Sequence, residues 1–139
     1  MAAEPVPGDP SALAAPRYGV ASLSDLSASV LSSLGVPGEP NTLGLEPTRR
    51  ACVLLIDGLG LELLRRNRHW APFLSHYLAD SATLSVGFPT TTATSLASLG
   101  TGSAPGEHGV LGYQVAVPGT DRLLNQLRWD DETDPEQWH

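Results

Sequence analysis

Two segments of the sequence carry residues that could do chemistry together. Asp57 and Gly58 follow a continuous apolar run, residues 51–56, and a cluster of hydroxyl residues, 90–95, comes further along the chain. An acid at the carboxyl end of a buried strand is well placed to bind a metal ion. A threonine hydroxyl at the start of a helix can act as a nucleophile once a metal ion or a base activates it, and the helix dipole favours the resulting anion. The pairing points to hydrolysis at phosphorus.

Each of these features also has a structural explanation. Asp-Gly is a common turn pair, and a run of threonines after a strand can simply supply an N-cap and β-branched residues. Gly58-Leu59-Gly60 does not continue into a dinucleotide-binding motif, so no such cofactor is expected. His69 and His76 have no ligand partners at helical spacing and are interpreted as surface or core residues.

The surrounding pattern predicts an α/β fold. The unbroken apolar run at 51–56 is typical of a parallel strand buried on both faces, where Cys52 would be a small buried residue. A second strand is expected over 82–86, and helices are expected over residues 61–67, 70–79 and 93–99. This alternation of strand and helix indicates a βαβ unit within a mostly parallel sheet.

The chain divides into three predicted units. Residues 1–17, rich in Ala and Pro, form a disordered leader. Residues 18–48 hold an amphipathic helix, over 22–34, that should pack through its apolar face, followed by a Gly- and Pro-rich connector. Residues 49–139 are the catalytic portion. Toward its C-terminal end we expect a hairpin over 115–124 around Pro118-Gly119, a short amphipathic piece over 124–129, and a polar, acidic stretch over 130–137.

Composition narrows the partners and the location. The chain has 8 basic and 15 acidic residues and a net charge of −7, which argues against duplex nucleic acid or an anionic membrane as a partner. A single cysteine excludes an internal disulfide and a cysteine-rich zinc site. The sequence shows neither a signal peptide pattern nor an apolar run of about 18 residues, so a soluble cytoplasmic protein is predicted.

Residues 50–115 resemble the N-terminal part of the nucleotide pyrophosphatase/phosphodiesterase group of the alkaline phosphatase superfamily. That group typically shows an apolar strand ending in Asp-Gly, a Pro-x-x-Thr nucleophile loop, a Thr-Gly pair nine residues after the nucleophile, and a Pro-x-x-His-Gly turn. The matching residues here are Asp57-Gly58, Pro89 to Ser95, Thr101-Gly102, Pro105 and His108-Gly109-Val110. Because Thr101 comes nine residues after Thr92, the spacing selects Thr92 over its neighbours.

The resemblance implies a fold, a pair of metal ions and a mechanism. The fold would be the N-terminal part of an alkaline-phosphatase-like three-layer sandwich with a central, mostly parallel sheet. Two divalent metal ions, usually zinc, would act on a small-molecule phosphate ester or nucleotide through a covalent phospho-threonine intermediate. Thr92 would attack phosphorus while contacting one ion, and Asp57 would bind that ion. His108-Gly109 would be the structural turn of the family.

The sequence departs from the family pattern in two ways. Family members carry an Asn shortly after the His-Gly turn that helps hold a phosphate oxygen, whereas residues 110–114 contain none, which leaves Tyr113 and Gln114 as candidate substitutes. The remaining metal ligands of the family lie downstream of this sequence, so we expect an apparently truncated N-terminal part of a longer enzyme. Within the same superfamily, the alternatives to phosphodiesterase activity are phosphonate hydrolase, sulfatase-like or phosphomutase chemistry. From a different class, the alternative is a catalytically inactive fragment or small α/β interaction module.

Overall fold

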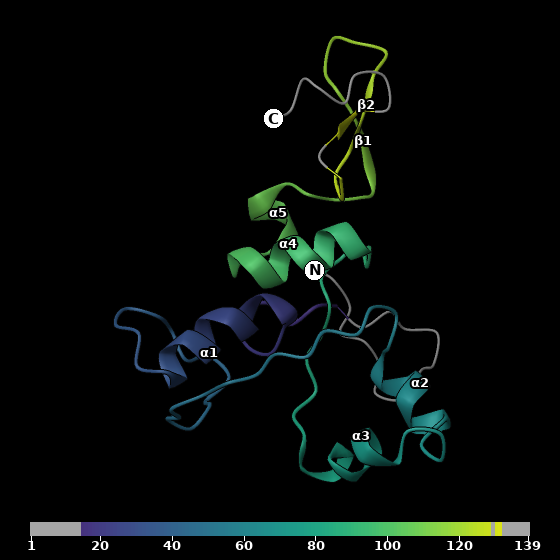
Figure 1. Cartoon of the computed structure of the whole chain (residues 1–139). Helices are drawn as coiled ribbons and strands as arrows, with labels where there is room; N and C mark the ends of the chain where they lie inside the picture. The colour runs from purple at the N-terminus through teal and green to yellow at the C-terminus, as the bar shows by residue number, and fades with distance from the viewer. Residues whose placement is uncertain (1–14, 129, 132–139) are drawn as a thin grey trace, which may run out of the picture.

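The computed structural model describes residues 15–128 and 130–131 (Figure 1). In this part of the chain, helical segments accompany a small antiparallel sheet with strand order β1-β2-β3, so the chain is of the α/β class. The elements, in chain order, are η1 (Leu23–Asp25), α1 (Leu26–Ser33), α2 (Leu61–Arg66), α3 (Pro72–His76), η2 (Leu78–Asp80), α4 (Thr92–Thr101), α5 (Pro105–His108), β1 (Gln114–Ala116), β2 (Leu123–Asn125) and β3 (Asp130–Asp131).

Helix α4 is the element on which its neighbours pack. It follows Thr91, whose side-chain oxygen accepts a hydrogen bond from the backbone N–H of Thr94, and it ends at Gly102, which has a left-handed φ of 69°. Segment η1, helix α1 and helix α5 all contact α4, and Figure 1 shows α4 between α1 and α5. The helix predicted over 93–99 is therefore confirmed, and it begins at Thr92.

Buried polar side chains gather in and beside η1, α1 and α4. They are Ser22, Ser24, Ser29, Ser33, Thr94 and Ser98. Ser29 Oγ donates to the carbonyl of Asp25 at 2.7 Å and accepts from the N–H of Leu43 at 3.1 Å, so Ser29 faces the connector. The half-buried Ser27 ties α1 to α4 through a bond from its Oγ to the carbonyl of Leu99. Each of these six buried hydroxyls has a hydrogen-bond partner, either a carbonyl or another side chain.

The helix over 22–34 is present, but its predicted apolar face is not the buried one. Leu31 and Leu34 are each 40% exposed, whereas the serines on the other side are buried. The prediction that this helix packs through its leucines is therefore wrong for the described residues. The reason is that α1 buries Ser29 and Ser33 toward the connector, whose Leu43 and Thr48 N–H groups donate to Ser29 Oγ and to the Ser33 carbonyl, and an apolar pattern does not reveal such bonds.

The apolar segment 51–56 forms no strand among the described residues. Leu54 is 71% exposed, Val53 is 50% exposed, and Cys52 is exposed as well. The predicted buried parallel strand and the predicted buried Cys52 are therefore wrong for this structure. A strand buried on both faces needs neighbouring strands, and within the described part of the chain residues 51–56 pair with none.

The second predicted strand, over 82–86, is also reduced. It contributes a single parallel bridge, between Ser85 and Ser22, in which the Leu23 N–H donates to the Ser85 carbonyl and the Ser85 N–H donates to the Ala21 carbonyl, both at 2.9 Å. The predicted βαβ unit is accordingly not formed by the described residues. The bridge instead joins residues 82–86 to the N-terminal segment.

The remaining predicted elements are found with shifted bounds. Helix α2 matches the prediction over 61–67, and the prediction over 70–79 becomes α3, with Pro72 in its first turn, followed by η2. Strands β1 and β2 form the expected hairpin, with Val115 opposite Leu124, and the turn contains Gly119 at a φ of 78°. In the short piece predicted over 124–129, residues 124–128 are the end of β2 and a turn, and residue 129 lies outside the described residues.

The two ends of the sequence lie partly outside the described residues. For the predicted leader, residues 1–14 are outside, and for the predicted acidic stretch, residues 132–137 are outside. Arg17, which the prediction placed in the leader, donates from its backbone N–H to Ser85 Oγ at 2.8 Å and so belongs with the packed part. No helix among the described residues is long and apolar enough to cross a membrane.

Candidate active site

The structure brings together the two residues that the sequence singled out. Thr92 Oγ1 lies 3.4 Å from Asp57 Oδ1 and 3.3 Å from Asp57 Oδ2. These distances exceed the usual 2.5–3.0 Å of an O–H···O hydrogen bond, so the direct contact is weak. Two oxygen ligands at about 2.0–2.1 Å from a tetrahedral zinc ion lie about 3.3–3.4 Å apart. The separation of Thr92 and Asp57 therefore fits a pair of ligands that share one ion.

Thr92 owes its place to the start of α4. It is the first residue of the helix, directly after the N-cap Thr91, and Thr91 Oγ1 lies 2.7 Å from Thr94 Oγ1. The first N–H groups of a helix have no partner within the helix, and together with the helix dipole they favour an anion at this end. Thr92 thus presents its hydroxyl where negative charge is stabilised.

Asp57 lies in a turn. Gly58 has a left-handed φ of 72°, and the N–H of Leu59 donates to the carbonyl of Ile56 at 3.4 Å. The structural explanation for the Asp-Gly pair is therefore correct, and it does not compete with a role at the site. The turn ends the apolar segment and leaves the carboxylate exposed beside Thr92.

A cavity of about 300 Å³ opens at this pair. Its lining residues are Leu55, Asp57, Thr92, Ser95 and Leu96. Ser95 was not selected from the sequence, although it lies three residues after Thr92 and therefore on the same face of a helix that begins there. That spacing is the signal that could have identified it. Ser95 adds a third polar side chain to the walls of the cavity.

The candidate substitutes for the missing Asn are not at this cavity. Tyr113 and Gln114 lie at the start of the hairpin, and neither is among the residues that line the cavity. The Tyr113 hydroxyl accepts a hydrogen bond at 2.9 Å from the side-chain amide of Asn125, which is itself buried. The Tyr113 hydroxyl is thus engaged in holding the hairpin.

The histidines do not contribute to the pair. His108 ends α5, where its Nε2 lies 3.0 Å from Ser98 Oγ and its Nδ1 accepts a hydrogen bond at 3.0 Å from the N–H of Val110. His69 and His76 are exposed. No group of three or more His, Cys, Asp or Glu side chains that could hold a metal ion exists among the described residues. Asp57 and Thr92 therefore supply only part of a zinc coordination shell.

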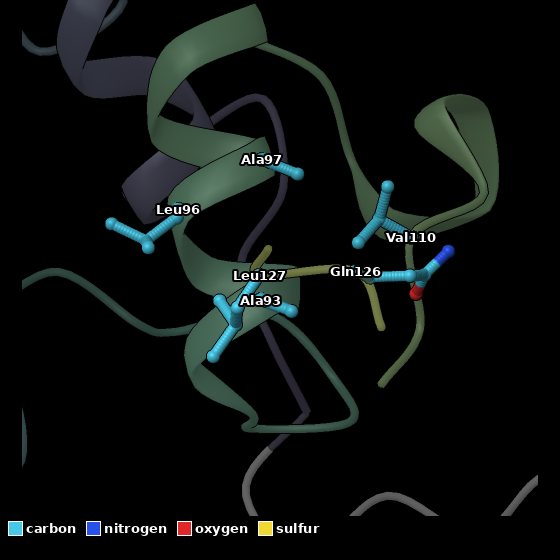
Figure 2. A pocket seen from close by; sticks show the side chains of 6 residues that line it. All are labelled: Ala93, Leu96, Ala97, Val110, Gln126 and Leu127. Atoms are coloured by element: carbon cyan, nitrogen blue, oxygen red, sulfur yellow. The ribbon is translucent and has the colours of Figure 1, made fainter. Parts of the chain in front are cut away.

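A second cavity lies along α4, toward the hairpin (Figure 2). Its lining residues are Ala93, Leu96, Ala97, Val110, Gln126 and Leu127. The walls carry no ionisable side chain, and Gln126 Oε1 is buried without a hydrogen-bond partner in the part of the chain that the structure describes. An apolar cavity without an acid, a base or a nucleophile offers no chemistry, so we place the candidate active site at Asp57 and Thr92.

Comparison with known proteins places this arrangement in a family. No curated protein and no solved structure gave a match to the chain. The family model described as type I phosphodiesterase / nucleotide pyrophosphatase matches residues 51–139, a range that includes both Asp57 and Thr92 and leaves out the N-terminal segment that packs on α4. The chain therefore belongs to the type I phosphodiesterase / nucleotide pyrophosphatase family.

Proposed function

We propose that the protein acts in metal-dependent hydrolysis of phosphodiester or pyrophosphate bonds in small phosphate esters or nucleotides, through a phospho-threonine intermediate on Thr92. One observation carries the proposal. Thr92 Oγ1, at the first position of α4, lies within 3.3–3.4 Å of both carboxylate oxygens of Asp57. Family membership supports the reaction class, since its members are described as phosphodiesterases and nucleotide pyrophosphatases.

The chemistry follows from the groups at the start of α4. Thr92 Oγ1 would form a bond to phosphorus, its proton leaving to solvent, while the bond between phosphorus and the leaving-group oxygen breaks. Water would then attack the phospho-threonine, release a phosphomonoester and restore the hydroxyl. The open N–H groups of the helix would stabilise the negative charge on the phosphoryl oxygens.

Two divalent ions, zinc in this proposal, belong to the mechanism. Bound zinc would supply Lewis acidity, which lowers the pKa of a hydroxyl and offsets phosphate charge. Asp57 and Thr92 would hold one ion. We propose that the remaining ligands come from further sequence of a longer parent protein, and that the same sequence covers residues 51–56 as part of an alkaline-phosphatase-like sandwich. The exposure of Leu54 and its neighbours supports this second point.

A second candidate function is a non-catalytic α/β interaction module. It is favoured by the incomplete set of ligands among the described residues and by the absence of Tyr113 and Gln114 from the cavity. The two candidates differ in whether Thr92 becomes phosphorylated. On the basis of the net charge of −7 we also propose that the protein has no membrane or duplex nucleic acid partner. We propose a cytoplasmic location from the sequence pattern described above.

The test is hydrolysis of a bis-nitrophenyl phosphodiester by the full chain and by its longer parent, with zinc added or with chelator. Thr92→Ala should lower the rate by about 1,000-fold or more, because the nucleophile is lost. Thr90→Ala is the matched control, since this exposed threonine does not line the cavity, and it should leave the rate unchanged. Equal hydrolysis by wild type and Thr92→Ala, in zinc and in chelator, would contradict the proposal.

A further inference from the structure

We propose that residues 17–25, which lie outside the range matched by the family, form a clamp on the loop that carries the nucleophile, and that Tyr18 is its main positioning residue. The loop is residues 86–91, directly before Thr92 and α4. This inference rests on the proposed function only in calling Thr92 the nucleophile. The contacts themselves are independent of that assignment.

Tyr18 holds the loop by its backbone. The N–H of Phe88 donates to the Tyr18 hydroxyl at 3.0 Å, across 70 residues of sequence. Within the loop, the N–H of Thr91 donates to the carbonyl of Pro89 at 3.0 Å, which shapes the loop but does not fix its position on the molecule. The bond from Phe88 to Tyr18 therefore anchors the loop from outside.

Packing at Gly87 fixes the same loop from two sides. Gly87 is buried, and a Cβ placed on it would lie 2.8 Å from Pro105 Cγ and 3.3 Å from the Tyr18 hydroxyl. The backbone is thus enclosed between Tyr18 and the first residue of α5, with no room for a side chain. A loop held this closely presents the following residues in one arrangement, which is what a nucleophile requires.

The clamp also binds the chain on both sides of the loop. Before the loop, Arg17 Nη2 donates to the carbonyl of Thr83 at 2.9 Å, and Ser85 is bridged to Ser22. After the loop, η1 contacts α4. The Ser22 N–H and hydroxyl both donate to Asp25 Oδ2, at 2.8 and 2.7 Å, which stiffens η1 itself. One N-terminal segment therefore sets the position of residues 83–88 before Thr92 and of the helix that begins with Thr92.

Amide hydrogen exchange on the full chain tests the clamp. Removing the hydroxyl with Tyr18→Phe should speed exchange of the Phe88 N–H by about five-fold, the usual effect of losing one hydrogen bond. Tyr77→Phe is the matched control, because Tyr77 is 54% exposed and its hydroxyl makes no hydrogen bond to the described residues. Phe88 exchange that is equally slow in wild type and Tyr18→Phe would overturn the clamp.

Kinetics of the active parent protein test the positioning role. Tyr18→Phe should lower kcat about five- to ten-fold with KM and the thermal unfolding midpoint unchanged, because the loop is displaced while the fold is kept. An unchanged kcat beside faster Phe88 exchange would overturn positioning. If Thr92→Ala remained fully active, the proposed function would fail, whereas Phe88 exchange would still decide whether the clamp exists.

Discussion

The region around α4 and the segment 51–56 place their side chains in opposite ways. Around α4, serine and threonine side chains are buried and hydrogen-bonded, and Ala93 and Pro105 are the buried apolar side chains among the described residues. In segment 51–56 every side chain is exposed, including those of Val53, Leu54, Leu55 and Ile56. The buried hydroxyls of the first region find hydrogen-bond partners within the described residues. The second region exposes apolar side chains to water, which is unfavourable.

The candidate active site takes one residue from each region. Thr92 comes from the packed region, where Tyr18, Gly87 and Thr91 fix the backbone before it. Asp57 follows the exposed segment and lies in a turn closed by the bond from the Leu59 N–H to the Ile56 carbonyl. The backbone before Thr92 is therefore fixed by contacts within the described residues. The position of Asp57 depends on what lies against residues 51–56.

The largest expected effect comes from Gly87 in the packed region. Gly87→Ala would force a Cβ to within 2.8 Å of Pro105 Cγ, and overpacking of this kind should lower the free energy of unfolding by about 2–3 kcal/mol. Gly100→Ala is the control, since nothing lies within 4 Å of its Cβ position in α4, and it should stabilise the chain by about 0.5 kcal/mol. Chemical denaturation measures both. Equal stability of the two variants would show that the backbone at Gly87 is not tightly enclosed.

A smaller effect is expected at the N-cap of α4. Thr91→Ala removes the oxygen that accepts from the Thr94 N–H, which should cost about 1 kcal/mol of unfolding free energy. Thr91→Ser keeps that oxygen and should cost only a few tenths of a kcal/mol. The difference between the two melting curves isolates the cap. Identical curves would show that the start of α4 is held by packing alone.

The smallest effect is expected in the exposed segment. Leu54→Lys should change the free energy of unfolding by less than about 0.5 kcal/mol, because the side chain is 71% exposed, and it should reduce self-association measured by light scattering. Leu63→Lys, at a leucine that is 51% exposed on α2, is the matched control. A loss of more than about 2 kcal/mol for Leu54→Lys would mean that segment 51–56 is covered in solution.

Local patterns predicted the local parts of this structure. The start of α4 and the hairpin turn at Gly119 follow from capping and turn residues that act over a few positions. The proximity of Asp57 and Thr92 followed from their positions after an expected strand and at the start of a helix. That reasoning placed the pair correctly even though residues 51–56 form no strand in the described structure.

Features that depend on distant residues were not predictable. The bond between Tyr18 and Phe88 spans 70 residues, and neither side chain carries a motif that marks it. The buried serine face of α1 was missed for a different reason, because apolar periodicity assumes that the hydrophobic face packs inward. Here the buried face carries Ser29, whose Oγ accepts a hydrogen bond at 3.1 Å from the N–H of Leu43 in the connector.

The packing of η1 and α1 on α4 has a consequence for the order in which the chain assembles. Residues 22–33 are synthesised well before their partner α4, so η1 and α1 must wait until residues 85–101 have been made. An apolar face would be prone to misassociation during that delay, whereas free serine hydroxyls are well hydrated and remain harmless. The long sequence separation between the N-terminal segment and α4 slows formation of the contacts between them. Because the hydroxyl surface does not associate readily with other chains, this delay does not promote misassociation.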